Sequence, residues 1–211
     1  MAPVAKFRSA LESSSYQSPD GGSAYAPLRE KMIGAATAMG YDTATMVECG
    51  VSWAEDHDTQ HHVRTAAYVQ YVNQCRIREF LSFEPFLGKE KFQDLMRFRG
   101  IGPVVKNFTA NLKRPVKFPD SLIVATHITE VFPDRYVTIT SMWSLTQQVI
   151  VADFKASVLF FDYGRGKPAN LLEAGGVYKD LYEALKERSA REVAIAAKWE
   201  KEHSKKSKAV L

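Results

Sequence analysis

The sequence has little cysteine and no long apolar run. Cys49 and Cys75 are the two cysteines among 211 residues, too few for a disulfide framework or a paired-cysteine zinc site. Such usage fits a reducing compartment, and we expect a cytoplasmic protein. No stretch approaches the roughly 20 apolar residues of a membrane-spanning helix, so no membrane span is expected. The first residues lack the apolar segment of a secretory signal, but Lys6, Arg8 and nearby serines leave a mitochondrial presequence as an alternative.

The excess of positive over negative charge is also small, because 28 basic and 24 acidic residues leave a net charge of +4. Much of the excess gathers near the C-terminus, at Lys198, Lys201, Lys205, Lys206 and Lys208. Such a cluster is consistent with a solvated tail or with a surface that attracts the phosphates of nucleic acids or membranes. We favour the tail and expect no nucleic-acid partner.

Local composition divides the chain into three parts. Residues 1–25 are rich in Ser, Gly, Ala and Pro and are predicted to be a mobile extension. Residues 26–172 form the predicted globular domain. Residues 173–211 hold a C-terminal helix, expected over about 177–200, and the basic tail. A chain of this length suits one sizeable core better than two compact domains.

The strongest helix signal covers residues 65–82, which contain no Gly or Pro and are apolar over much of the helix circumference. A helix of this kind is mostly buried. A helix from Pro27 to Met39 and a strand from Cys49 to Trp53 are predicted before it, and a short helix near Lys89–Arg97 after it. Four later segments rich in Val, Ile, Thr, Phe and Tyr are predicted strands: Val104–Lys113, Leu122–Val131, Tyr136–Leu145 and Val149–Tyr163.

Short links between the late strands favour an antiparallel meander over parallel winding. The turn at residues 132–135 joins two of them. In the last strand the alternating apolar residues are expected on one face: Ile150, Ala152, Phe154, Ala156, Val158 and Phe160. The predicted fold is therefore α+β, with a five-stranded antiparallel sheet wrapped around the long helix.

The segment from Trp53 to Tyr68 concentrates polar side chains between a predicted strand and the start of the buried helix. A helix N-terminus offers unpaired N–H groups and a partial positive charge. An oxygen that gains negative charge during a reaction would be stabilised there. Asp56 and Asp58 precede this terminus by one loop, and a carboxylate can act as a general base or as a nucleophile.

The residues alone leave three interpretations of this segment open. Asp56 and Asp58 could cap the helix or tie down the loop, with His57, His61 and His62 solvated. His57 and His61 have i,i+4 spacing and could bind a metal if the loop were helical, but no other His/Cys cluster supplies further ligands, so no metal site is expected. The third interpretation is a carboxylate-dependent hydrolase.

Several short motifs in this region follow one another in a recognisable order: Asp56-His57-Asp58, His62-Val63 and Ala66-Ala67-Tyr68, then Arg76 and Glu79 on the helix. This order resembles the hotdog thioesterases of the 4-hydroxybenzoyl-CoA thioesterase family. Weaker similar blocks follow at Arg114-Pro115-Val116, Asp120-Ser121-Leu122, and Asp162 with Gly166-Lys167-Pro168. The resemblance covers about residues 47–172. The chain departs from it at His61, where the family usually has Gly, and at Arg64-Thr65, where it usually has two Asn.

The resemblance implies a hotdog fold that hydrolyses an acyl-CoA thioester to free acid and CoA. It assigns Asp58 as the catalytic carboxylate, the backbone N–H of Thr65 as the group that polarises the carbonyl, and His62 as a residue that shapes the loop or contacts substrate. Supporting roles fall to Asp56, Arg64 and Tyr68. The phosphates of CoA need positive partners, for which the candidates are Lys106, Lys113, Arg114 and Lys117.

The same resemblance implies a homodimer or a dimer of dimers, with the CoA thioester as substrate and no cofactor. The departures at His61 and Arg64-Thr65 motivate an alternative, a non-catalytic hotdog module that binds acyl groups or partner proteins. A hotdog dehydratase or hydratase is less favoured, because those enzymes typically carry a His and an acidic residue on the central helix. The acyl group itself is not specified by the sequence.

Overall fold

The computed structural model describes residues 25–208, and side chains up to residue 203. The predicted extension at residues 1–25 lies outside this range apart from Tyr25. Helices are α2 (Ala26–Ala38), α3 (Trp53–Asp56), α4 (Thr65–Leu81), α5 (Glu84–Met96), α6 (Leu171–Ala174) and α7 (Val177–Lys208), with a 3₁₀ turn at Thr43–Thr45. Strands are β1 (Val47–Gly50), β2 (Ile101–Leu112), β3 (Ser121–Phe132), β4 (Arg135–Ser144), β5 (Val149–Asp162) and β6 (Lys167–Pro168).

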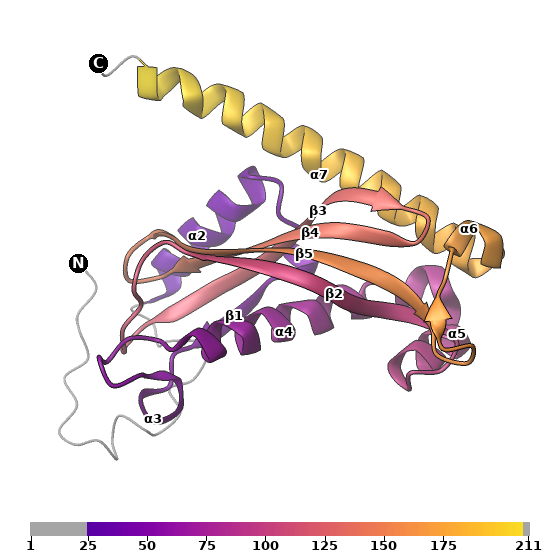
Figure 1. The fold of residues 1–211 in the computed structure, drawn as a ribbon. Helices are drawn as coiled ribbons and strands as arrows, with labels where there is room; N and C mark the ends of the chain where they lie inside the picture. The colour runs from indigo at the N-terminus through magenta and orange to yellow at the C-terminus, as the bar shows by residue number, and fades with distance from the viewer. Residues whose placement is uncertain (1–24, 209–211) are drawn as a thin grey trace.

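The strands form one curved antiparallel sheet in the order β1-β3-β4-β5-β2, and the two-residue β6 pairs with β5. Helix α4 lies along one side of this sheet (Figure 1), which confirms the predicted α+β hotdog architecture. The predicted meander is correct only for β3, β4 and β5. Strand β2 pairs with β5 instead of β3, because β1 occupies the start of the β3 edge and β2 closes the opposite side.

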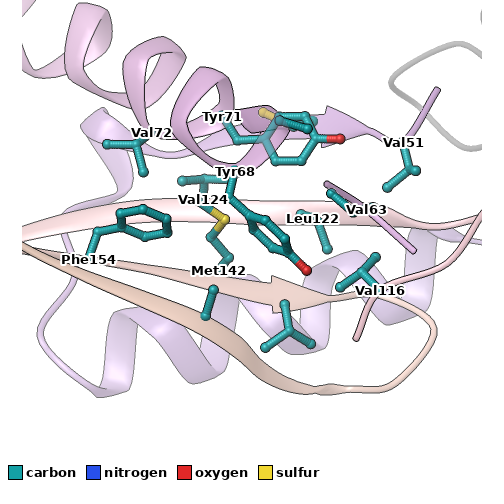
Figure 2. Packing of buried hydrophobic residues seen from close by; sticks show 14 of the residues in the cluster. Val51, Val63, Tyr68, Tyr71, Val72, Val116, Leu122, Val124, Met142 and Phe154 are labelled. Atoms are coloured by element: carbon teal, nitrogen blue, oxygen red, sulfur yellow. The ribbon is translucent and has the colours of Figure 1, made fainter. Parts of the chain in front are cut away.

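The main core lies between α4 and the concave face of the sheet. Tyr68 and Val72 of α4 lie on the side of the strands that carry Met142 and Phe154, and Tyr71 points toward Val51 (Figure 2); all five residues belong to one buried cluster. These helical residues follow the i, i+3, i+4 spacing of a single stripe. Each large apolar side chain buried in this way stabilises the fold by roughly 1.5–3 kcal/mol.

A β-bulge in β5 changes the predicted face of one residue. Met142 pairs with Ala152 whereas the next residue, Trp143, pairs with Ile150, so Val151 is the extra residue. Val151 and Ala152 are therefore both buried against α4. Ile150 packs instead with the outer cluster around Trp143, contrary to the expectation that it shares a face with Ala152.

Helix α7 covers the edge of β3 that β1 leaves unpaired. The backbone N–H of Ile128 donates to Glu192 Oε2 at 2.6 Å, and Arg188 is buried between Glu192 and Asp42. An exposed strand edge invites pairing with other chains, and a covering helix prevents it. The contact is tight at Gly40 (φ +89°), where a Cβ would lie 2.5 Å from the Glu192 carbonyl oxygen.

Several element ends differ from the predictions. The strand expected at Cys49–Trp53 ends at Gly50, because the Ser52 side chain accepts a hydrogen bond from the Glu55 N–H and starts α3 at Trp53. Helix α5 begins at Glu84, before the expected position, and is broken by Gly88 (φ 72°). Helix α7 runs beyond the predicted residue 200. Within residues 25–208, no helix combines the length and apolarity that crossing a membrane requires.

Candidate active site

The loop between α3 and α4 folds back on itself as a small antiparallel bridge. His57 pairs with Val63, and the Asp58 N–H donates to the His62 carbonyl at 2.8 Å. The bridge returns the chain from Asp58 to the start of α4. Asp58 and the helix N-terminus therefore belong to one short, hydrogen-bonded loop.

Asp58 is exposed, and its carboxylate is anchored by one oxygen. Oδ1 accepts the backbone N–H groups of Gln60 at 2.8 Å and His62 at 3.0 Å. Oδ2 makes no hydrogen bond within residues 25–208. The hydrogen bond from His62 is the main cause that lowers the pKa of Asp58. The group is thus an ionised carboxylate at neutral pH with one oxygen available for chemistry.

Asp56 lies in a different environment and fastens the loop. It is only 6% exposed. Its Oδ2 accepts the Ser52 N–H at 2.7 Å and the Tyr71 hydroxyl at 2.8 Å, and its carbonyl accepts the Arg64 N–H at 2.7 Å. The two aspartates therefore differ in environment. Asp56 is buried and holds the loop through hydrogen bonds, whereas Asp58 is exposed.

The first turn of α4 presents unpaired N–H groups. Arg64 is the N-cap residue (φ −68°, ψ 150°) and its side chain makes no capping hydrogen bond. Thr65 is the first helical residue and is exposed. Its N–H has no acceptor within the part of the chain that the structure describes. Together with the helix dipole, this N–H can stabilise an oxygen that gains negative charge.

His61 occupies the position where the hotdog thioesterases usually have Gly. The backbone conformation of His61 explains the family's preference for Gly there. Its φ is 60°, in the left-handed region that Gly adopts without strain. The imidazole stacks on the Trp53 ring, with centroids 5.5 Å apart and planes at 14°. The loop therefore keeps the conformation that a Gly would favour, and the stacking offsets part of the steric cost.

The remaining predicted residues line the loop and the helix start. His62 is half-buried, and its backbone N–H, not its ring, contacts Asp58. Tyr68 is 2% exposed, and burial raises its pKa to about 12. Tyr71, the partner of Asp56, is a residue of the site that the sequence pattern does not reveal. Its position in the apolar stripe of the helix marks it as core, and only the fold brings its hydroxyl to the loop.

His57 connects the loop to the segment that follows β2. Its Nε2 accepts the Phe118 N–H at 3.0 Å, so this nitrogen is unprotonated and the ring is neutral. Burial lowers its pKa. The contact requires the neutral ring, because a protonated imidazole has no acceptor left.

Acid is therefore expected to destabilise the protein through His57. Because its folded-state pKa is lowered, the stability it contributes is present above its unfolded pKa of about 6.5 and is lost as pH falls from there through the folded pKa. His57→Gln, whose amide oxygen can accept the same bond, is expected to show a smaller fall in Tm between neutral and mildly acidic pH. Thermal melts across pH test this, with His203→Gln, at an exposed position of α7, as control. Parallel curves for wild type and His57→Gln would contradict it.

A narrow cleft runs beside α4 toward β2. It is lined by one stripe of the helix and by the concave face of the sheet: Val69, Val72, Asn73, Arg76, Phe108, Thr140, Phe154 and Ala156. Its volume is about 20 Å³. That is room for about one water molecule, so a single chain in this conformation offers no space for an acyl group there.

The four basic candidates for CoA binding do not cluster. Lys113 forms an ion pair with Asp153 and lines the outer face of the sheet. Lys106 lies at an irregularity of β2, roughly 20 Å along the strand from Lys113. Arg114 and Lys117 are exposed in the segment that leads to Phe118. Of the four, Lys117 lies nearest in sequence to the His57 contact.

The alternative metal site finds no support in the loop geometry. Residues 57–61 form a turn and not a helix, so the i,i+4 spacing of His57 and His61 does not place them on one helical face. No group of three or more His, Cys, Asp or Glu side chains that could hold a metal ion occurs in the described part of the chain.

A curled antiparallel sheet around one long helix, with a carboxylate loop at the start of that helix, defines a hotdog-fold protein. Residues 51–185 match the family model of the thioesterase-like superfamily. The chain belongs to this family, which confirms the predicted family and the predicted class of enzyme, thioester hydrolase. No curated protein matches the sequence significantly.

Solved structures with the same fold come from several bacteria. A DHNA-CoA thioesterase from Staphylococcus aureus is 16% identical, with a TM-score of 0.54 over 67% of this chain and 89% of the other. A probable thioesterase from Escherichia coli is 19% identical (TM-score 0.51; 65% and 96%). A thioesterase from Thermus thermophilus, complexed with coenzyme A and Zn, is 17% identical (TM-score 0.51; 66% and 92%). At these identities the likeness concerns the fold.

Proposed function

We propose that this protein hydrolyses acyl-CoA thioesters with Asp58 as the catalytic carboxylate. The observation that carries the proposal is that one loop has, at its two ends, two polar groups that make no hydrogen bond among the described residues. They are Asp58 Oδ2 and the N–H of Thr65. The CoA ester named for the Staphylococcus aureus relative and the coenzyme A bound to the Thermus thermophilus relative support the substrate class.

The proposed reaction uses these two groups in sequence. The thioester carbonyl oxygen accepts the Thr65 N–H, and Asp58 either removes a proton from an attacking water or attacks the carbonyl carbon itself. The C–S bond then breaks and CoA leaves as a thiolate. In the second case water hydrolyses the resulting anhydride. A thiolate is a good leaving group, so no strong general acid is needed, and no cofactor supplies the base or the electrophile.

Asp56 and Tyr71 hold this arrangement in place in our proposal. Their hydrogen bond fixes the loop against α4. His62 contacts the substrate or shapes the loop. Arg64 and Tyr68 support the helix start. Lys117 and Arg114 are the better placed candidates for the phosphates of CoA, since Lys113 already pairs with Asp153.

Hydrolysis itself is tested by incubating the protein with a panel of short, long and aromatic acyl-CoAs and measuring the release of the CoA thiol. We expect turnover of at least one class, and no turnover of the corresponding oxygen esters at comparable rates, because an alkoxide leaves far less readily than a thiolate. Retention of acyl ligands without hydrolysis of any member would favour a non-catalytic acyl-binding module instead.

We also propose that the working unit is at least a homodimer joined through β2. Strand β2 pairs only with β5 among the described residues, and Asn107–Leu112 are exposed on both faces, including Phe108 (49%) and Leu112 (44%). Such an edge offers unpaired N–H and C=O groups to a second strand. The cleft of about 20 Å³ beside α4 further indicates that one chain does not complete an acyl site.

The dimer predicts a specific loss of assembly. Leu112→Asp places a charge on the free edge and is expected to give monomers, measured by light scattering after size-exclusion chromatography. Leu172→Asp on α6 is the matched control, since Leu172 is similarly exposed at 40%, and it is expected to stay dimeric. A monomeric wild type, or a Leu112→Asp variant as dimeric as wild type, would contradict the proposed interface.

A further inference from the structure

A second cavity lies on the outer face of the sheet and is separate from the candidate active site. Its volume is about 500 Å³, within the range of small-molecule sites. Ser141 lines this cavity, whereas its neighbour Thr140 lines the cleft beside α4. Successive residues of a strand point to opposite faces, so the two spaces lie on opposite sides of the sheet.

A fixed chain of hydrogen bonds forms the polar part of the cavity. Ser141 Oγ donates to Asp153 Oδ1 at 2.7 Å, which uses its only hydrogen because an ionised carboxylate can only accept. The Tyr41 hydroxyl, 2.6 Å from Ser141 Oγ, must therefore donate to it. Asp153 also pairs with Lys113. These groups satisfy one another and leave no net charge.

His127 is the polar group of the cavity that remains unsatisfied. It is 7% exposed, lines the cavity and packs on the Tyr41 ring with centroids 4.8 Å apart. Its Nδ1 is buried and has no hydrogen-bond partner in the described part of the chain. Burial lowers its pKa, so the ring is neutral and has an acceptor nitrogen. A buried polar group without a partner is costly. Nδ1 itself is out of contact with solvent, so a ligand in the cavity packs against the His127 ring and does not bond to this nitrogen.

Two carboxylates stand at the rim of the cavity. Glu130 and Glu200 are exposed at its edge, and neither has a partner cation that the structure describes. With Asp153 neutralised by Lys113 and His127 uncharged, the lining carries a net negative charge. Trp199 and Val193 of α7 supply apolar and aromatic surface. One face of the Trp199 ring stacks on His203, with centroids 4.1 Å apart, and an indole ring attracts cations through its remaining face.

We propose that this outer cavity binds a small organic cation with an aromatic or other apolar body. Its charged N–H group lies toward the rim carboxylates, and its body packs against α7 and the His127 ring. The proposal concerns a site distinct from the loop of Asp58 and does not depend on the hydrolysis reaction.

Three probes of the same shape test the charge preference on the full-length protein. Benzamidine is the cation, benzamide the neutral analogue and benzoate the anion. We expect benzamidine to shift the NMR resonances of the His127 imidazole and the Trp199 indole in a saturable manner, benzamide to do so more weakly and benzoate not at all. Equal shifts with benzoate, or none with benzamidine at millimolar concentration, would overturn the proposal.

Variants on exposed positions locate the site without touching the core. Ala197→Trp fills the cavity and is expected to abolish the benzamidine shifts while leaving acyl-CoA hydrolysis unchanged. Ala194→Trp, exposed on the same helix outside the cavity, is the matched control. Replacing Glu130 and Glu200 with Gln is expected to weaken benzamidine about three- to ten-fold, as for two partly exposed charges. The double variant Glu183→Gln, Glu187→Gln makes the same change of charge outside the cavity and is its control. Wild-type affinity for benzamidine in Ala197→Trp would refute the proposed location of the site.

Discussion

Asp58→Asn is expected to lower kcat for acyl-CoA hydrolysis by about 10²–10⁴-fold, the range for losing a positioned base, with Tm close to that of wild type. The Asn oxygen can still accept the N–H groups of Gln60 and His62, which both bond to Oδ1. The substitution therefore removes the charge and the free Oδ2 but leaves the loop tied. Thiol-release kinetics with calorimetry on the same preparation separate the two effects.

Asp162→Asn is the matched control for that substitution. Asp162 Oδ1 also accepts two backbone N–H groups, those of Gly164 and Arg165, in a turn at the other end of the sheet. Wild-type turnover is expected in this variant. If both variants lost activity alike, or Asp58→Asn retained wild-type kcat, Asp58 would not be the catalytic group.

Thr65→Pro is expected to lower kcat by about 10²–10³-fold, as for removal of one oxyanion-hole donor, with little loss of stability. Proline removes one backbone N–H and nothing else that this position needs. The first helical position tolerates proline, whose φ is preset for the helix. The preceding residue must be extended, and Arg64 already is, at φ −68° and ψ 150°.

Thr65→Ala provides the comparison, because it removes the side chain but keeps the N–H. Circular dichroism and melting curves should superimpose for the two variants, while only Thr65→Pro loses turnover. A Thr65→Pro enzyme that is folded and fully active would show that the start of α4 does not polarise the carbonyl.

The sequence predicts the parts of this fold that rest on local patterns. Helix α4 was expected over residues 65–82 and spans Thr65–Leu81, because its apolar stripe is long and uninterrupted. The three strands of the β3-β4-β5 hairpins also follow from alternation and turn residues. The pairing of β2 with β5 was not predictable in this way, because two strands distant in sequence meet only when the sheet closes around the helix.

The assignment of Asp58 as the catalytic carboxylate and Asp56 as a supporting residue came from the family resemblance and stays a prediction, because the residues alone do not distinguish the two. Asp56 and Asp58 are two residues apart and chemically alike, yet one is buried on Tyr71 and the other is exposed. That difference depends on how α3 turns the chain, which a four-residue helix hardly signals. The outer cavity could not be predicted from the sequence either, because the fold brings Tyr41, His127 and Ser141 together from three separate segments.

The most direct test of the central claim is the single-turnover rate of thioester cleavage, measured by rapid quench with enzyme in excess over an acyl-CoA that the wild type turns over. This rate reports the chemical step without product release. We predict that Asp58→Asn binds the acyl-CoA but cleaves it at least about 10²-fold more slowly than wild type. Equal single-turnover rates for the two proteins would contradict the assignment of Asp58 as the catalytic carboxylate.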